Sequence, residues 1–147
     1  MPATPPTLPS AGLLRRIGAL VYDLLLLLAA LMVVTALATL VTGGEALYPA
    51  PWWYQLLLVA TWALFWCGFW VHGGQTLGMK AWHIRVRTAD GRPLGWREAG
   101  LRLLAAVPAM APAGVGLWWL LFDSDRLAWH DRLSRTRVVV ERPPRRG

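Results

Sequence analysis

Residues 15–42, RRIGALVYDLLLLLAALMVVTALATLVT, decide the fold. From Ile17 to Thr42 this stretch is apolar apart from Asp23 and a few threonines. At ~1.5 Å per residue, a helix of that length crosses a hydrocarbon core of ~30 Å.

The whole chain of 147 residues is 56% hydrophobic and 16% charged, with a mean hydropathy of +0.41. A soluble domain is about a quarter charged, and a chain this short cannot build a very large core. The sequence therefore predicts a membrane protein.

A cleaved signal peptide is the alternative interpretation of this stretch. Arg15 and Arg16 precede the apolar run, and residues 36–38, Ala-Leu-Ala, resemble a cleavage site. The apolar region of a signal peptide is about 7–15 residues long, however. The run here is longer and contains an acid. We therefore expect a retained transmembrane helix over about residues 17–41.

A second uncharged segment, about residues 52–71, opens with the aromatic residues Trp52, Trp53 and Tyr54 and is also long enough to span. The connector between the two segments carries Glu45 as its only charge. Positive residues flank the other ends of both segments; they are Arg15, Arg16, Lys80, Arg85, Arg87, Arg92, Arg97 and Arg102. By the positive-inside rule, both ends of this hairpin, including the N-terminus, are expected in the cytoplasm.

A β-element is expected over about residues 80–95. Apolar Trp82, Ile84 and Val86 alternate there with basic or imidazole side chains, which is the period of a strand. Asp90-Gly91 predicts a turn, and residues 92–94 a short returning strand, so we expect a small cytoplasmic β-hairpin. Residues 136–140 are also β-prone and suited to pairing with the strand around residues 84–86.

A third hydrophobic segment, about residues 103–122, is uncharged but interrupted by Pro108, Pro112, Gly114 and Gly116. A full crossing would place the arginine-rich tail outside, against the charge rule. We therefore expect a broken, re-entrant or interfacial helical segment, with a true third span as the alternative. The predicted fold class is a membrane all-α protein: a two-span helical hairpin, this third segment, and the small β-hairpin.

The remaining domain boundaries follow from composition. Residues 1–12 are proline-rich and are predicted to form a disordered leader, with Ser10 as a candidate helix N-cap. Residues 13–140 are predicted to form a single membrane domain, and residues 141–147 a basic tail.

Arg16 and Asp23 are the unusual residues of the first helix. They are seven positions apart, so they share a face at ~10.5 Å along the axis, which is too far for a direct salt bridge. Arg16 is able to extend to the headgroups. Asp23 lies deeper, where an acid costs on the order of 2–3 kcal/mol, so it needs a partner or a proton. Asp23 is either a proton- or cation-handling carboxylate, or one half of an interhelical ion pair with Arg102 or Arg132.

Other chemistries find little support in the sequence. His130, Asp131 and Ser134 are sequence neighbours without a nucleophile-elbow motif, so we expect no enzyme. The three histidines lie in different segments and Cys67 is the single cysteine, so we expect no metal and no cofactor. The glycine-rich residues 73–80 lack Walker A spacing. The net charge of +7 comes from arginines beside hydrophobic runs, which favours anionic lipid headgroups as partners over nucleic acid.

The polar residues together resemble the RDD family of bacterial membrane proteins, which is named for one arginine and two aspartates. Arg16, Asp23 and Asp131 match that signature, and the resemblance runs from about residue 13 to residue 140. The other matching elements are residues 74–80, residues 84–86, Asp90-Gly91, Arg102, and residues 130–133 with Thr136. The chain departs from the pattern at Ser134-Arg135, where many members have a small residue and glycine.

The resemblance implies a multi-pass protein of the bacterial inner membrane whose molecular function is largely unassigned. It makes Arg16, Asp23 and Asp131 the signature residues; the supporting set is Arg102, His130, Arg132, Thr76, Gly78 and Lys80. It also suggests transport of a small ligand, with cation/proton exchange as one form. Two spans cannot enclose a pathway, so transport requires a homo-oligomer or a larger membrane complex. The alternative is a non-transporting scaffold or accessory factor, in which the Arg/Asp set locks helix packing.

Overall fold

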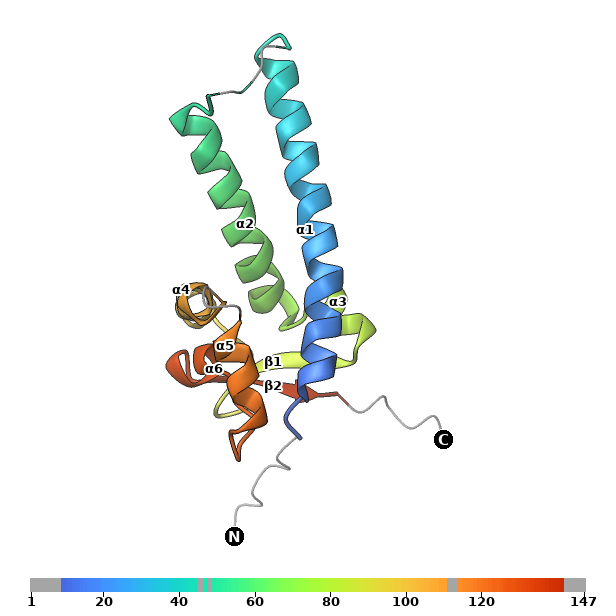
Figure 1. Ribbon diagram of the computed structural model, residues 1–147, viewed down its shortest axis with the longest axis vertical. Helices are drawn as coiled ribbons and strands as arrows, with labels where there is room; N and C mark the ends of the chain where they lie inside the picture. The colour runs from blue at the N-terminus through green and yellow to red at the C-terminus, as the bar shows by residue number, and fades with distance from the viewer. Residues whose placement is uncertain (1–8, 45–46, 48, 111–113, 142–147) are drawn as a thin grey trace.

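The computed structural model describes residues 9–44, 47, 49–110 and 114–141. Two long helices, α1 (Leu13–Val41) and α2 (Trp52–Gly73), run side by side as a hairpin (Figure 1). Both are long and apolar enough to cross a membrane. Their outer faces expose large side chains such as Leu25 (63% exposed) and Leu56 (61%), as lipid-facing helices do and soluble core helices do not. The predicted spans of 17–41 and 52–71 are thus present, extended to residues 13 and 73.

Hydroxyl groups inside the hairpin are satisfied locally. Thr35, Thr39 and Thr42 each donate to the carbonyl four residues earlier in α1. Thr35 Oγ1 also lies 2.8 Å from the hydroxyl of Tyr54 in α2. This contact joins the two helices near the connector. The opposite end of the hairpin, where α1 begins and α2 ends, is held by other contacts.

The shorter elements gather at that other end, where α1 begins and α2 ends (Figure 1). We call this part, residues 74–110 and 114–141, the base. Its elements are α3 (Leu77–Ala81), β1 (Ile84–Thr88), α4 (Trp96–Met110), α5 (Val115–Trp118), η1 (Trp119–Leu121), α6 (Trp129–Leu133) and β2 (Thr136–Val140). The base and the adjoining ends of the long helices share a main apolar core, which includes Trp66, Trp70, Ile84, Val86 and Val138. A second, smaller cluster is formed by Leu117, Leu120 and Ala128.

The sheet consists of β1 paired antiparallel with β2, in a register that runs from Ile84 opposite Val140 to Thr88 opposite Thr136. The predicted pairing of residues 136–140 with the first strand is confirmed. The predicted returning strand at residues 92–94 is wrong. One edge of β1 pairs with β2, and on the other edge Val86 N donates to Gly74 O at 2.7 Å. Residues 88–92 form a turn, with Gly91 at φ +81°, from which the chain leaves for α4.

Residues 9–12 also belong to the base. Val140 N donates to Pro9 O at 2.9 Å, and Ala11 N donates to Val138 O at 2.8 Å, so this segment lies along β2. The predicted leader therefore extended too far at residues 9–12, and its residues 1–8 lie outside the described residues. The N-cap of α1 is Gly12 and not Ser10, because Ser10 bridges to Val139 instead. Of the predicted tail, only residue 141 is described.

The third hydrophobic segment is divided among three elements, α4, α5 and η1. α4 has 15 residues, with Pro108 inside it, and lies crosswise to the hairpin, so that Figure 1 shows it end-on. At ~1.5 Å per residue it is shorter than a hydrocarbon core of ~30 Å. Gly114, at φ +72°, then starts α5, which returns against α4. Gly116 packs so closely there that a Cβ atom on it would lie 2.6 Å from Ala109 Cβ.

This close approach predicts the effect of a single methyl group. Gly116→Ala should lower the free energy of unfolding by about 1–3 kcal/mol, because α5 must move away from α4. The measurement is thermal unfolding of the full chain in detergent. Gly100→Ala, in α4 itself, is the matched control: a Cβ there meets nothing within 4 Å, so stability should hold or rise slightly. Equal effects of the two changes would contradict the packing argument.

Candidate functional site

A buried carboxylate between two guanidinium groups lies at the centre of the base. Asp131 of α6 is 1% exposed. Its Oδ2 atom is paired with Nη1 of Arg16 from α1, and its Oδ1 atom lies 2.6 Å from Nη1 of Arg102 in α4. Both arginines are buried as well. Each oxygen of the acid therefore has its own cation, and we call Arg16, Arg102 and Asp131 the triad.

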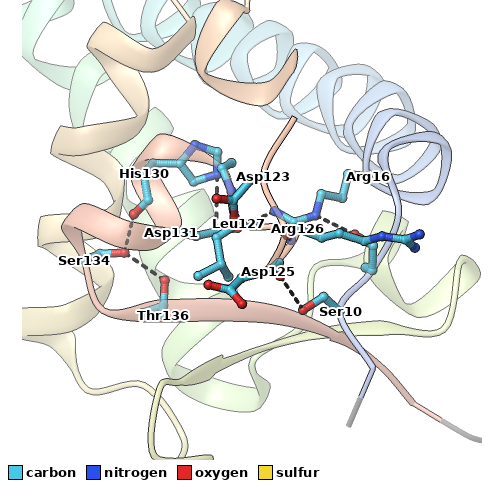
Figure 2. A network of polar contacts seen from close by, with 12 residues as sticks. Ser10, Arg16, Asp123, Asp125, Arg126, Leu127, His130, Asp131, Ser134 and Thr136 are labelled. Atoms are coloured by element: carbon cyan, nitrogen blue, oxygen red, sulfur yellow. Dashed lines mark hydrogen bonds and ion pairs between the residues drawn. The ribbon is translucent and has the colours of Figure 1, made fainter. Parts of the chain in front are cut away.

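Further hydrogen bonds satisfy other atoms of the triad, and Figure 2 shows the surroundings of Arg16, whereas Arg102 Nε has no partner among the described residues. Arg16 donates from Nε to Ala11 O at 3.1 Å and from Nη2 to Arg126 O at 3.2 Å. Arg102 Nη1 donates to Thr136 Oγ1 at 2.5 Å. Such hydrogen bonds are needed to offset the desolvation of buried charges. They also tie α1, α4, α6 and β2 to a single point.

The local structure of α6 aims Asp131 at this point. Asp131 is the third residue of the helix, and its Oδ2 accepts from the N-cap amide of Ala128 at 3.1 Å. Ser134 donates to the main-chain carbonyl of His130 at 2.5 Å and lies 2.8 Å from Thr136 Oγ1. The serine hydroxyl therefore closes the helix and meets the histidine backbone rather than its imidazole, which is not the arrangement of a hydrolase triad.

Charge and burial set the protonation of these groups. Burial alone would raise the pKa of Asp131, but the positive charges of Arg102 and Arg16 outweigh it and hold that pKa well below its usual range. Burial lowers the pKa of His130 to about 4, and Arg102 adds to the effect. At neutral pH the site thus holds an ionised Asp131 and an uncharged His130.

Asp23 makes a second, separate contact with the base. It is 1% exposed in α1 and accepts hydrogen bonds from Thr76 Oγ1 and from Gly78 N, the latter at 2.9 Å. Thr76 is the N-cap of α3, and its Oγ1 also accepts from Met79 N at 3.1 Å. A Cβ atom on Gly78 would lie 2.8 Å from Asp23 Oδ1, so this close approach requires glycine. Lys80, in the same short helix, is exposed.

The structure corrects the expected partners of the signature residues. Asp23 does not pair with Arg102 or Arg132, because hydroxyl and amide donors from α3 occupy its oxygens. Arg16 does not extend to the headgroups; it is 6% exposed and pairs with Asp131. Arg132 turns outward and pairs with Asp123. Arg102, His130 and Asp131 come together in the base.

Sequence reasoning missed two residues of the site. Trp70 is 5% exposed, and its ring lies 5.2 Å from the Arg102 guanidinium carbon. Nothing distinguishes it in sequence from the other tryptophans of the second span. Asp123 accepts from Leu127 N at 2.8 Å and pairs with Arg132. An acidic residue in a strongly basic stretch was a usable signal for the pair of Asp123 and Arg132.

A cavity of about 350 Å³ lies between the triad and the hairpin. Its walls come mainly from α1, α2 and α4, with single residues from α3, β1, α5, α6 and β2, and are mainly apolar. The polar or aromatic side chains that line it include Arg16, Asp23, Trp66, Trp70, Arg102 and His130. Among the described residues, no group of three His, Cys, Asp or Glu side chains is placed to hold a metal ion.

A membrane-length helical hairpin joined to a small base through buried arginine and aspartate side chains defines a class of integral membrane proteins. The model of the RDD family matches residues 10–135, and the chain belongs to the RDD family. Comparison with curated proteins gave no match, and neither did comparison with solved structures. The family identifies a membrane protein and leaves its molecular function unassigned.

The depressed pKa of His130 predicts a pH dependence of stability. The unfolded chain takes up a proton near pH 6.5 and the folded site only near pH 4. Stability contributed by the neutral imidazole is therefore complete above pH 6.5 and lost as the pH falls toward 4. Thermal unfolding in detergent should show a loss of about 2 kcal/mol between pH 7 and pH 5. His130→Gln should remove this loss, whereas His72→Gln, at an exposed position, should retain it. The same pH dependence in wild type and His130→Gln would contradict the assignment.

Proposed function

We propose that this chain is an accessory or scaffold protein of the bacterial inner membrane, in which the Arg/Asp set locks a two-span hairpin to a cytoplasmic base. The orientation is supported by charge. The base holds Lys80, Arg85, Arg87 and Arg92 among its cations, whereas Glu45 is the only charge of the connector. The N-terminus is then cytoplasmic, and the arginines face anionic headgroups.

The crosswise helix fits the membrane interface in this arrangement. α4 exposes Leu101, Leu104 and Val107, while Trp118 and Trp119 are exposed on α5 and η1. An amphipathic helix parallel to the bilayer buries such side chains at the boundary between headgroups and acyl chains, where tryptophan is favoured. We therefore place residues 96–110 and 114–121 at the cytoplasmic interface, as an interfacial segment and not a third span.

The pairing of Asp131 with two arginines carries the proposal. A carboxylate held between two cations, with its pKa far below the usual range, does not take up and release protons near neutral pH. Both oxygens of Asp23 are likewise occupied by donors from α3. These arrangements suit fixed structural contacts better than cation/proton exchange.

Small-ligand transport is the second candidate, and the cavity favours it. The cavity is lined by Arg16, Asp23 and Arg102, so polar side chains of the signature are available to a ligand. A two-span chain does not surround a pathway by itself. Transport would thus require several copies, or a larger membrane complex.

A double-mutant cycle on Arg16 and Asp131 tests the lock. Asp131→Asn leaves two buried guanidinium groups without their counter-charge, so it should lower the free energy of unfolding by about 3–5 kcal/mol. Arg16→Met should also destabilise, and the double variant should lose clearly less than the sum of the two. Unfolding in detergent and abundance in the membrane fraction are the measurements.

The exposed pair of Arg92 and Asp90 is the matched control for this cycle. Its side chains are 71% and 74% exposed, so Arg92→Met with Asp90→Asn should cost less than about 1 kcal/mol. Proteoliposome flux driven by a pH gradient separates the two candidates. Asp131 variants that keep wild-type stability but lose such flux would overturn the lock and support transport.

A further inference from the structure

We propose that the cavity binds a single-chain amphiphile with a carboxylate head, taken up from the cytoplasmic leaflet. This inference goes beyond the structural lock and does not depend on it. It rests on what the cavity offers to a ligand: unpartnered hydrogen-bond donors beside a cation at the polar end, and aromatic and aliphatic side chains elsewhere.

The polar wall contains buried nitrogen atoms without a partner in the described part of the chain. They are Nε1 of Trp70, Nε of Arg102 and Nδ1 of His130, on side chains that are all more than nine-tenths buried. Buried polar atoms are nearly always hydrogen-bonded in native proteins, and each exception calls for an explanation. The three side chains that carry these atoms, from α2, α4 and α6, line the same cavity.

These atoms specify the chemistry of the head. An indole N–H and a guanidinium N–H only donate, so the ligand must supply acceptor oxygens. The Arg102 guanidinium lies over the Trp70 ring, which places the positive charge beside the indole donor. A carboxylate accepts from both and gains charge-assisted bonds. An alkylammonium would bring a like charge and no acceptor, because its nitrogen has no free lone pair.

The rest of the cavity specifies the chain. Leu20, Leu24, Trp62, Leu103 and Val107 line it. Leu24 and Val107 are each 51% exposed, so the cavity reaches the outer, lipid-facing surface of the hairpin. A volume of about 350 Å³ is at the lower end of the ~300–1,000 Å³ range of small-molecule pockets. That size suits one short hydrocarbon chain better than a two-chain phospholipid.

The test uses the full chain in phosphatidylcholine nanodiscs, with 11-bromoundecanoate as the probe. Bromine on the chain quenches nearby tryptophans, and Trp62 and Trp66 line the cavity in addition to Trp70. We expect saturable quenching. Trp70→Phe keeps an aromatic ring at this position but removes the indole N–H donor. It should therefore raise the Kd for 11-bromoundecanoate about tenfold. Ala106→Phe, on the cavity wall, should abolish saturable quenching, whereas its neighbour Ala105→Phe should not.

Matched heads on the same brominated chain separate specific binding from partition into lipid. The trimethylammonium analogue should quench without saturation and equally in wild type and Trp70→Phe. Saturable binding of that cation with a Kd equal to that of the carboxylate would overturn the proposal. A carboxylate Kd unchanged by both Trp70→Phe and Ala106→Phe would overturn it as well. The stability of each variant, measured by thermal unfolding, identifies any that fails to fold; Trp70→Phe then decides the outcome without Ala106→Phe.

Discussion

The bond that the rest of the structure depends on is the pairing of Asp131 with Arg16 and Arg102. A hairpin of two apolar helices has little reason to hold a fixed position against a polar base, because lipid satisfies its outer faces equally well. The triad supplies that reason by making separation costly: each partner, left alone, would be a buried charge without a counter-charge. We therefore expect α4, α6 and the start of α1 to fold as one cooperative unit.

A second point of attachment turns this bond into a defined geometry. Arg16, Ala19, Asp23 and Leu27 are buried on α1 at helical spacing, so one face of the helix meets the base and α2. Arg16 fixes that face at the triad, and Asp23 fixes it two turns deeper, against Thr76 and Gly78 of α3. Two attachments on one face determine both the rotation of the helix and its depth. The glycine at position 78 is the condition for the second, since the chain passes too close to Asp23 for a side chain.

Sequence reasoning succeeded where the signal was long or repeated. Two apolar runs of membrane length were enough for the hairpin, the signature motifs for the family, and the β-prone residues 136–140 for the sheet partner. It failed where the partner of a residue carries no charge, and where a local pattern suggested a nearby partner that does not form. Asp23 was expected to meet an arginine, but a hydroxyl and a main-chain amide hold it, and neither leaves a recognisable pattern. The returning strand at residues 92–94 was a local inference, defeated by a strand almost fifty residues away.

The sequence separation within the triad has a consequence for biosynthesis. Arg16 and Asp131 are 115 residues apart, and residues 9–11 pair with the final strand. At ~5–20 residues per second, the ribosome needs on the order of ten seconds to make the second partner after the first. Throughout that interval Arg16 has no lasting partner, and Asp23 has none until residues 76–78 are made. The base of the nascent protein therefore stays open until residues 131–140 have left the ribosome and can pair with residues 9–16.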